Sequence, residues 1–223
     1  MRISLKPLCS LFKWLCCALL AMVLPIAMYA PTYYDFTNIL SLYMPFVGIV
    51  LLSDLALLEK ASNTEEIAFI SNRNPIRIYL FRLFFTIGLI LVFTLLANGA
   101  YSIRHYFSES ASIDEALTII DVLIVSCAST VFIGSVAMTF STILNNIYIG
   151  YGISLIYWLF WNVNATLSSP FNPFSLIANP ASYKEHALAL YALFALLIMA
   201  NCYFVTKSPF FISDKVRKHL GFQ

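Results

Sequence analysis

Residues 59–82, EKASNTEEIAFISNRNPIRIYLFR, form a polar segment between two uncharged apolar runs, Phe36–Ser53 and Leu83–Ile103. Each run is about as long as the ~20 residues that an α-helix needs to cross the hydrocarbon core of a bilayer. The polar segment is therefore predicted to be a loop between two membrane spans. Its position determines how the rest of the chain is divided.

This loop carries the sequence pattern of a short capped helix. The Ser62 side chain is placed to accept a hydrogen bond from the backbone N–H of Glu65. The Glu65 side chain is placed to accept one from the backbone N–H of Ser62, as in a capping box. Glu65 and Glu66 also fall in the predicted first turn, where the helix dipole favours negative charge. The apolar residues at 67–70 would give this helix a surface for a partner outside the bilayer. An ordinary cytoplasmic loop that folds on itself is the alternative interpretation.

The composition excludes a water-soluble globular protein. The chain has 223 residues, of which 61% are hydrophobic and only 11% are charged. Its net charge of +2 does not indicate a nucleic-acid partner. The cysteines lie in or beside apolar runs without paired spacing, so we expect free thiols.

The distribution of apolar runs predicts an all-α membrane protein with six spans. A transmembrane domain at 14–206 is preceded by an interfacial segment at 1–13 and followed by a basic cytoplasmic tail at 207–223. The first span contains Pro25, where we expect a kink. The expected spans are 14–30, 37–58, 75–101, 113–144, 147–163 and 185–206.

The segment at 164–183, between the last two spans, is apolar but interrupted by Pro170, Pro173 and Pro180. Irregular backbone is not tolerated where it faces lipid, because its polar groups would lack partners. We therefore expect a re-entrant segment that dips into the outer leaflet and is shielded by protein.

The distribution of positive charge predicts that both termini are cytoplasmic. In that orientation eleven of the 13 Lys and Arg residues lie inside, and only Arg104 and Lys184 lie outside. Cytoplasmic loops carry an excess of Lys and Arg, so this ratio fixes the expected topology.

Polar and small residues within the spans have structural interpretations. We expect Asp54 to pair with Arg77 or Arg82, and Asp121 to pair with Arg104, because charges near a membrane are usually neutralised. Three glycines are expected at close helix contacts, where the lack of a side chain lets backbones approach. They are Gly134, Gly150 and Gly152.

No catalytic or nucleotide-binding motif is evident. The one Lys-Ser pair, Lys207-Ser208, lacks the glycine-rich turn of a phosphate-binding loop. The three histidines fall in separate segments, so we expect neither a metal site nor an intramembrane hydrolase. They are His105, His186 and His219. The chain is therefore predicted not to be an enzyme.

Two stretches resemble the type-two ABC exporter permeases, the membrane subunits of ATP-binding-cassette transporters. The loop is similar to the one between their second and third spans, although Asn63 replaces the usual Gly and Arg82 the commoner Lys. Residues 172–175, Asn-Pro-Phe-Ser, resemble a motif that precedes the last span of these permeases. The matching loop positions are Glu59-Lys60, Asn63-Thr64-Glu65, Ile67–Ile70, Asn72-Arg73 and Arg82.

The resemblance implies that the loop at 59–74 is a cytoplasmic coupling helix that docks on separate ATPase subunits. ATP and Mg would be bound by those subunits, and no cofactor by this chain. The implied coupling residues are Glu59, Ser62, Thr64, Glu65, Glu66, Phe69, Ile70 and Arg73.

It further implies a homodimer or a heterodimer with a second permease chain, in the bacterial cytoplasmic (plasma) membrane. The second and fifth spans would face the partner across the path of an exported cargo. Few buried charges, no metal ligands and abundant aromatic residues favour an amphipathic or hydrophobic cargo, such as a peptide, antibiotic or lipid. The path residues would be Phe46, Asp54, Asn145, Tyr148 and Tyr151. A non-transporting immunity or assembly factor that binds a partner through the same loop is the alternative.

Overall fold

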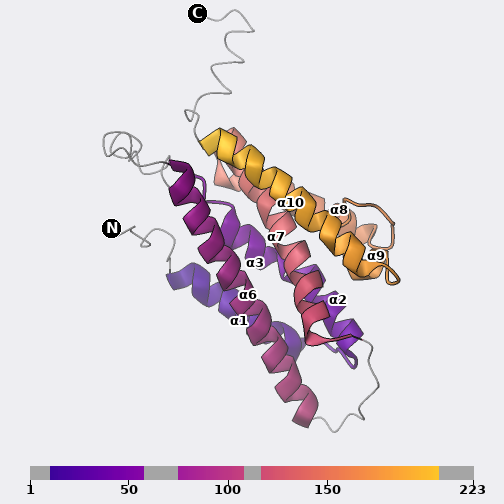
Figure 1. The fold of residues 1–223 in the computed structure, drawn as a ribbon. Coiled ribbons are helices and arrows are strands. Elements are labelled where there is room, and N and C mark those ends of the chain that lie inside the picture. The colour runs from indigo at the N-terminus through magenta and orange to yellow at the C-terminus, as the bar shows by residue number, and fades with distance from the viewer. Residues whose placement is uncertain (1–10, 58–74, 108–116, 206–223) are drawn as a thin grey trace, which may run out of the picture.

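The structure is a computed structural model that describes residues 11–57, 75–107 and 117–205. All regular secondary structure in these ranges is helical (Figure 1). The helices are α1 (Leu11–Ala27), α2 (Tyr33–Tyr43), α3 (Pro45–Leu52), α6 (Pro75–Phe107), α7 (Ile119–Leu144), α8 (Ile147–Val163), α9 (Ser175–Ala178) and α10 (Tyr183–Val205).

Four of these helical segments are long and apolar enough to cross a membrane, which confirms the predicted class of all-α membrane protein. They are Tyr33–Leu52, Ile76–Tyr106, Ile119–Leu144 and Tyr183–Val205. Two shorter apolar helices, Phe12–Ala27 and Ile147–Val163, occupy the positions of the predicted first and fifth spans. Six spans remain a prediction.

Helix α7 is the centre of the bundle. It packs against α10, α3, α8, α2 and α6, and in Figure 1 it runs between α6 and α10. The most apolar stretch of α7 is 78% buried, whereas that of α10 is only 11% buried. Helix α1 packs mainly on α6, at the periphery.

Taken together, the four long apolar segments and the shorter helices α1 and α8 alternate in direction along the chain (Figure 1). Tyr79, near the start of α6, donates to the sulfur of Met138, near the end of α7 (3.5 Å), so these two helices are antiparallel. Asn201, near the end of α10, donates to Oγ1 of Thr139 (2.7 Å), so α10 runs parallel to α7. Helix α3 ends and α6 begins at the same end of the bundle, on either side of residues 58–74 (Figure 1).

Glycines bring the backbones of α3 and α7 into contact. A Cβ atom added to Gly134 would lie 2.7 Å from the carbonyl carbon and oxygen of Gly48, and one added to Gly48 would collide with the carbonyl oxygen of Thr130. Gly150 similarly lies against Ala137 and Ser141. These findings confirm close packing at Gly134 and Gly150. Around Gly152 the described residues leave open space, so its predicted contact is wrong.

Buried hydroxyl groups of α7 donate to the helix itself. Thr130, Ser135, Thr139 and Thr142 each donate to a carbonyl oxygen three or four residues earlier, at 2.6–2.7 Å. Local bonding of this kind lets a helix carry Ser and Thr through an apolar interior at little cost in free energy.

The predicted second span at 37–58 is not one continuous helix. Helix α2 ends at Tyr43, α3 begins at Pro45, and turns follow Leu52. The reason is Pro45, which has no N–H to donate to the carbonyl of Ser41 and whose ring crowds that turn.

Other boundaries also differ from those expected. Helix α7 begins at Ile119 rather than at 113, because Thr118 has extended backbone and forms a capping box with Asp121. Helix α1 ends at Ala27, two residues after Pro25, and α6 continues to Phe107 rather than 101.

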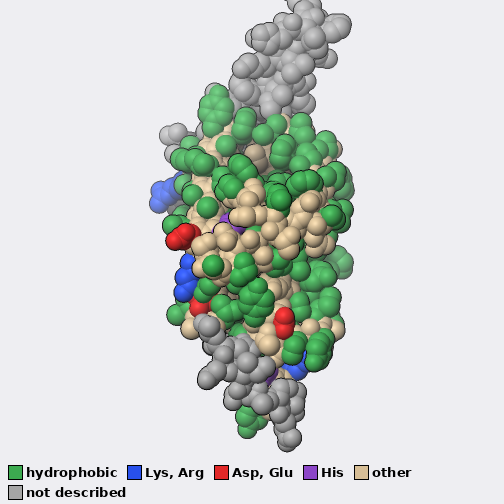
Figure 2. Space-filling view, turned by 90° about the vertical axis from the view of Figure 1, so that its right-hand side faces the viewer, with side chains coloured by type: hydrophobic (Ala, Val, Ile, Leu, Met, Phe, Trp, Pro, Cys, Tyr) green, Lys and Arg blue, Asp and Glu red, His purple; other side chains and the backbone are tan. Residues whose placement is uncertain are grey.

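Hydrophobic side chains cover much of the face shown in Figure 2, whereas its middle is mostly uncharged polar side chains and backbone. Charged residues of the described chain lie near helix ends or in the connections, which leaves the middle of each long helix uncharged. They are Lys13, Asp35, Asp54, Arg77, Arg82, Arg104, Asp121, Lys184 and Glu185.

The α3–α7 contact generates a stability prediction. Gly134→Ala should lower the free energy of unfolding by about 1–3 kcal/mol, because the new methyl group meets backbone atoms that cannot rotate away. The matched control is Gly88→Ala in α6, where a Cβ would meet nothing within 4 Å. Thermal denaturation of both variants in detergent measures the difference. Equal midpoints would contradict the close approach.

Candidate functional site

The predicted coupling residues lie outside the described residues. This applies to Glu59, Ser62, Thr64, Glu65, Glu66, Phe69, Ile70 and Arg73, and also to residues 1–10 and the tail at 207–223. The structure does describe the residues that flank the loop, Leu57 and Pro75, and the charged groups near them.

Lys13 and Asp54 form an ion pair beside this end of the bundle. The ammonium group of Lys13, at the start of α1, donates to Asp54, in the turns after α3. The two side chains are 29% and 20% exposed, so the pair is partly shielded from solvent. The sequence suggested Arg77 or Arg82 for Asp54, and Lys13 was missed because it belongs to the predicted interfacial segment before the first span.

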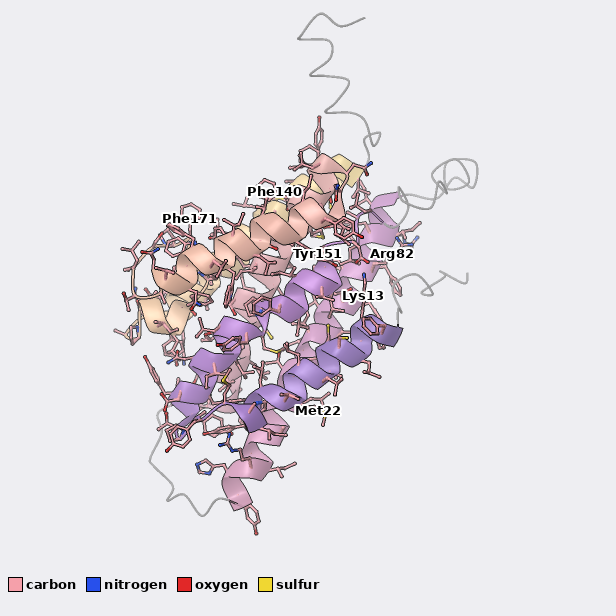
Figure 3. The ribbon with its side chains drawn as sticks, turned by 180° about the vertical axis from the view of Figure 1, so that it is seen from behind. Lys13, Met22, Arg82, Phe140, Tyr151 and Phe171 are labelled. Carbon is pink, nitrogen blue, oxygen red and sulfur yellow. The ribbon has the colours of Figure 1, made fainter. Side chains whose placement is uncertain are left out.

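Basic residues predominate at the end where 58–74 connects α3 to α6. Figure 3 shows Lys13 and Arg82 at this end of the bundle, and Arg77 is exposed in the first turns of α6. Asp54 is the one acidic residue of the described ranges found there. At the opposite end, Asp35, Asp121 and Glu185 accompany Arg104 and Lys184.

Arg104 caps the C-terminus of α1. Its guanidinium donates to the carbonyl oxygens of Pro25 (2.5 Å) and Met28 (2.6 Å). The last carbonyls of a helix lack intrahelical donors, and the helix dipole favours a cation there. This contact joins α1 to α6 at the end opposite Lys13.

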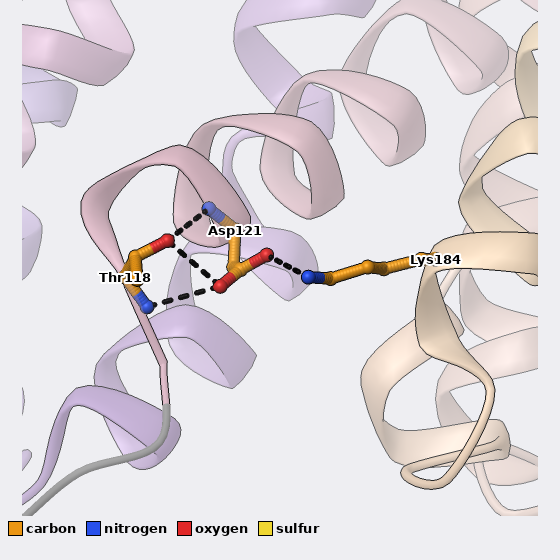
Figure 4. Close-up of polar contacts among 3 residues, drawn as sticks. All are labelled: Thr118, Asp121 and Lys184. Carbon is orange, nitrogen blue, oxygen red and sulfur yellow. Dashed lines mark hydrogen bonds and ion pairs between the residues drawn. The ribbon is translucent and has the colours of Figure 1, made fainter.

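Asp121 pairs with Lys184, not with Arg104 as the sequence suggested (Figure 4). Oδ1 of Asp121 lies 2.9 Å from Nζ of Lys184. Oδ2 accepts from the backbone N–H (3.0 Å) and the hydroxyl (2.8 Å) of Thr118. The Asp121 carboxylate therefore completes the N-terminal cap of α7 and also binds Lys184 at the start of α10.

We predict that Asp121→Ala lowers the free energy of unfolding by about 1–2 kcal/mol, because it removes a helix cap and an ion pair together. Glu185→Ala, an exposed acidic residue beside Lys184, is the control and should be near neutral. Heating detergent-purified protein and measuring the fraction that still elutes as a monodisperse peak compares the two. Similar losses would show that the cap adds nothing.

The structure brings together two of the five predicted path residues. Phe46 on α3 and Tyr151 on α8 border the same cluster of buried apolar side chains, and Figure 3 shows Tyr151 on the side of α8 that faces α3. Asp54 is instead paired with Lys13. Asn145 forms the left-handed turn between α7 and α8, with φ of 50°, and Tyr148 is 78% exposed.

Trp158 of α8 has a role that the sequence did not assign. Its indole N–H donates to the carbonyl oxygen of Leu42 (2.7 Å), and its ring lies 4.9 Å from that of Phe46. Tyr43 is the next aromatic neighbour, with ring centres 6.5 Å apart. The available signal was Pro45, a helix breaker whose neighbouring carbonyls need outside donors.

The segment at 164–183 is described throughout and is organised by Asn172. This buried side chain donates to the carbonyls of Ala165 (2.8 Å) and Leu167 (3.0 Å) and accepts from the backbone N–H of Phe174 (3.0 Å). Phe174 is fully buried, and α9 packs against α10, α2 and α7. The segment thus packs on one end of the bundle, and its re-entrant position in a membrane stays a prediction.

We predict that Asn172→Ala opens this segment, since it leaves two carbonyls and one N–H without partners at a cost of roughly 1–3 kcal/mol. In limited proteolysis, cleavage within residues 164–183 should be faster in the variant than in the wild type. Asn162→Ala, at an exposed position of α8, is the control. Unchanged cleavage would mean that the loop is held by packing alone.

The described ranges contain no candidate metal site. No group of three His, Cys, Asp or Glu side chains there is arranged to hold a metal ion. Four cysteines in these ranges are free thiols, as the sequence suggested: Cys16, Cys17, Cys127 and Cys202.

Comparison with known proteins returns no relative. No family model matches the chain, no curated protein matches it, and no solved structure matches it. A function is therefore inferred from the residues and their arrangement.

Proposed function

We propose that this chain is the permease subunit of an ABC exporter, with six membrane spans, cytoplasmic termini and ATP hydrolysis on separate subunits. The four long apolar helices and the two shorter ones alternate in direction, which supports an even number of crossings. The uncharged middle of each long helix supports a position within the bilayer.

One observation carries the proposal. The chain leaves α3 and enters α6 at the end of the bundle where basic residues predominate, so residues 58–74 connect two spans on the side expected to be cytoplasmic. That segment contains the capping-box pattern of Ser62 and Glu65 that resembles a coupling helix.

The position of the loop also suggests how force would be transmitted. A push on residues 59–74 acts directly on α3 and α6, the two helices that the loop joins. Helix α3 is packed tightly on α7 through Gly48 and Gly134, whereas α6 carries α1. Closure of an ATPase dimer would thus tilt α3 and α7 relative to α6 and α1, and so open the path to one side of the membrane and then the other. The coupling can act only through contacts that differ between these two states.

The partners follow from the same proposal. Two ATPase subunits bind ATP and Mg, a second permease chain completes the path, and the bilayer covers the outer apolar faces. Helix α1 presents such a face, with Phe12, Leu15, Leu19, Met22, Val23 and Ile26 all exposed. The uncharged aromatic contact between α3 and α8 supports an amphipathic or hydrophobic cargo.

The test is photolabelling of the affinity-purified full chain with 8-azido-ATP in membranes of its own host. We expect a co-purifying polypeptide to be labelled and this chain to remain unlabelled. Deletion of 63–70 should reduce the co-purified label about ten-fold or more, because the docking helix is lost, and Glu65→Ala should reduce it less.

Glu185→Ala, which removes an equal charge at the opposite end of the bundle, is the control. If no labelled chain co-purifies, the exporter proposal is wrong and the immunity or assembly role stands. If label co-purifies equally with the deletion variant, the chain has an ATPase partner that docks elsewhere.

A further inference from the structure

The break between α2 and α3 lies just past the middle of the apolar segment Tyr33–Leu52. Pro45 cannot donate to the carbonyl of Ser41, and the helix resumes at Pro45 with Met44 as its N-cap. A helix interruption inside an apolar segment requires donors from other elements, because no water is available to satisfy the freed backbone groups.

Trp158 of α8 supplies one such donor. Its N–H reaches the carbonyl oxygen of Leu42, in the last turn of α2 (2.7 Å). The indole ring also packs against Phe46, on the other side of the break. A single side chain of α8 therefore contacts both the helix before the break and the helix after it.

Helix α8 is otherwise attached to the bundle through α7. Its buried residues, Gly150, Ser154 and Trp161, form one narrow stripe, and Gly150 lies against Ala137 and Ser141 of α7. Contact between α8 and α3 is sparse by comparison with the contact that either makes with α7. The two helices can therefore separate from each other without leaving α7.

We propose that the Trp158–Leu42 hydrogen bond is a latch that holds α8 closed against the break between α2 and α3. Its release lets α8 and α2–α3 part while both remain packed on α7. The closed form is favoured because an open form leaves the Leu42 carbonyl without this donor in apolar surroundings. The inference does not depend on an ATPase partner.

The test is hydrogen–deuterium exchange of the full chain in detergent, comparing wild type with Trp158→Phe, which keeps an aromatic ring but removes the N–H. We expect exchange to rise roughly two- to ten-fold in peptides covering 40–48 and 150–158, as for loss of one hydrogen bond. Peptides covering 126–139 of α7 should be unchanged.

Trp161→Phe is the matched control. It makes the same substitution one turn away on the same helix, and the buried indole nitrogen of Trp161 has no hydrogen-bond partner among the described residues. An equal effect of both substitutions, a uniform rise that includes α7, or no rise at all would overturn the latch. Aggregation of Trp158→Phe but not of Trp161→Phe would also overturn it, since the bond would then be needed for the bundle itself.

Discussion

The close approach of α3 and α7 is the constraint on which the rest of the structure depends. Gly134 lies against the backbone of Gly48, and the two helices can touch in this way only because neither residue has a side chain. In a membrane there is no hydrophobic driving force between helices, so packing of this kind must supply the attraction. The position of α7 as the central helix follows from it.

Polar groups complete the bundle without placing charge in its middle. Arg104 satisfies the end of α1, and Asp121 satisfies the start of α7 and binds Lys184 of α10. Each of these contacts lies at a helix end, where backbone groups lack partners and charged side chains reach the interface. The same demand for partners explains why Trp158 bonds to the backbone beside Pro45.

These observations also explain which sequence-based predictions succeeded. Helix positions followed from apolar runs, because an uncharged stretch of about 20 residues has few other stable forms. Partners of charged residues were predicted poorly: Asp121 binds Lys184, and Asp54 binds Lys13. Those pairings depend on which helices become neighbours, and a single sequence without repeats does not contain that information.

The sequence by itself determined the helical class, the approximate helix positions and the location of charge at helix ends. Only the tertiary structure decided that α7 is central, that Gly48 meets Gly134, and that Trp158 reaches Leu42. The reason is physical: local pattern fixes where hydrogen bonds along one segment can form, whereas contacts between segments depend on how all of them pack at once.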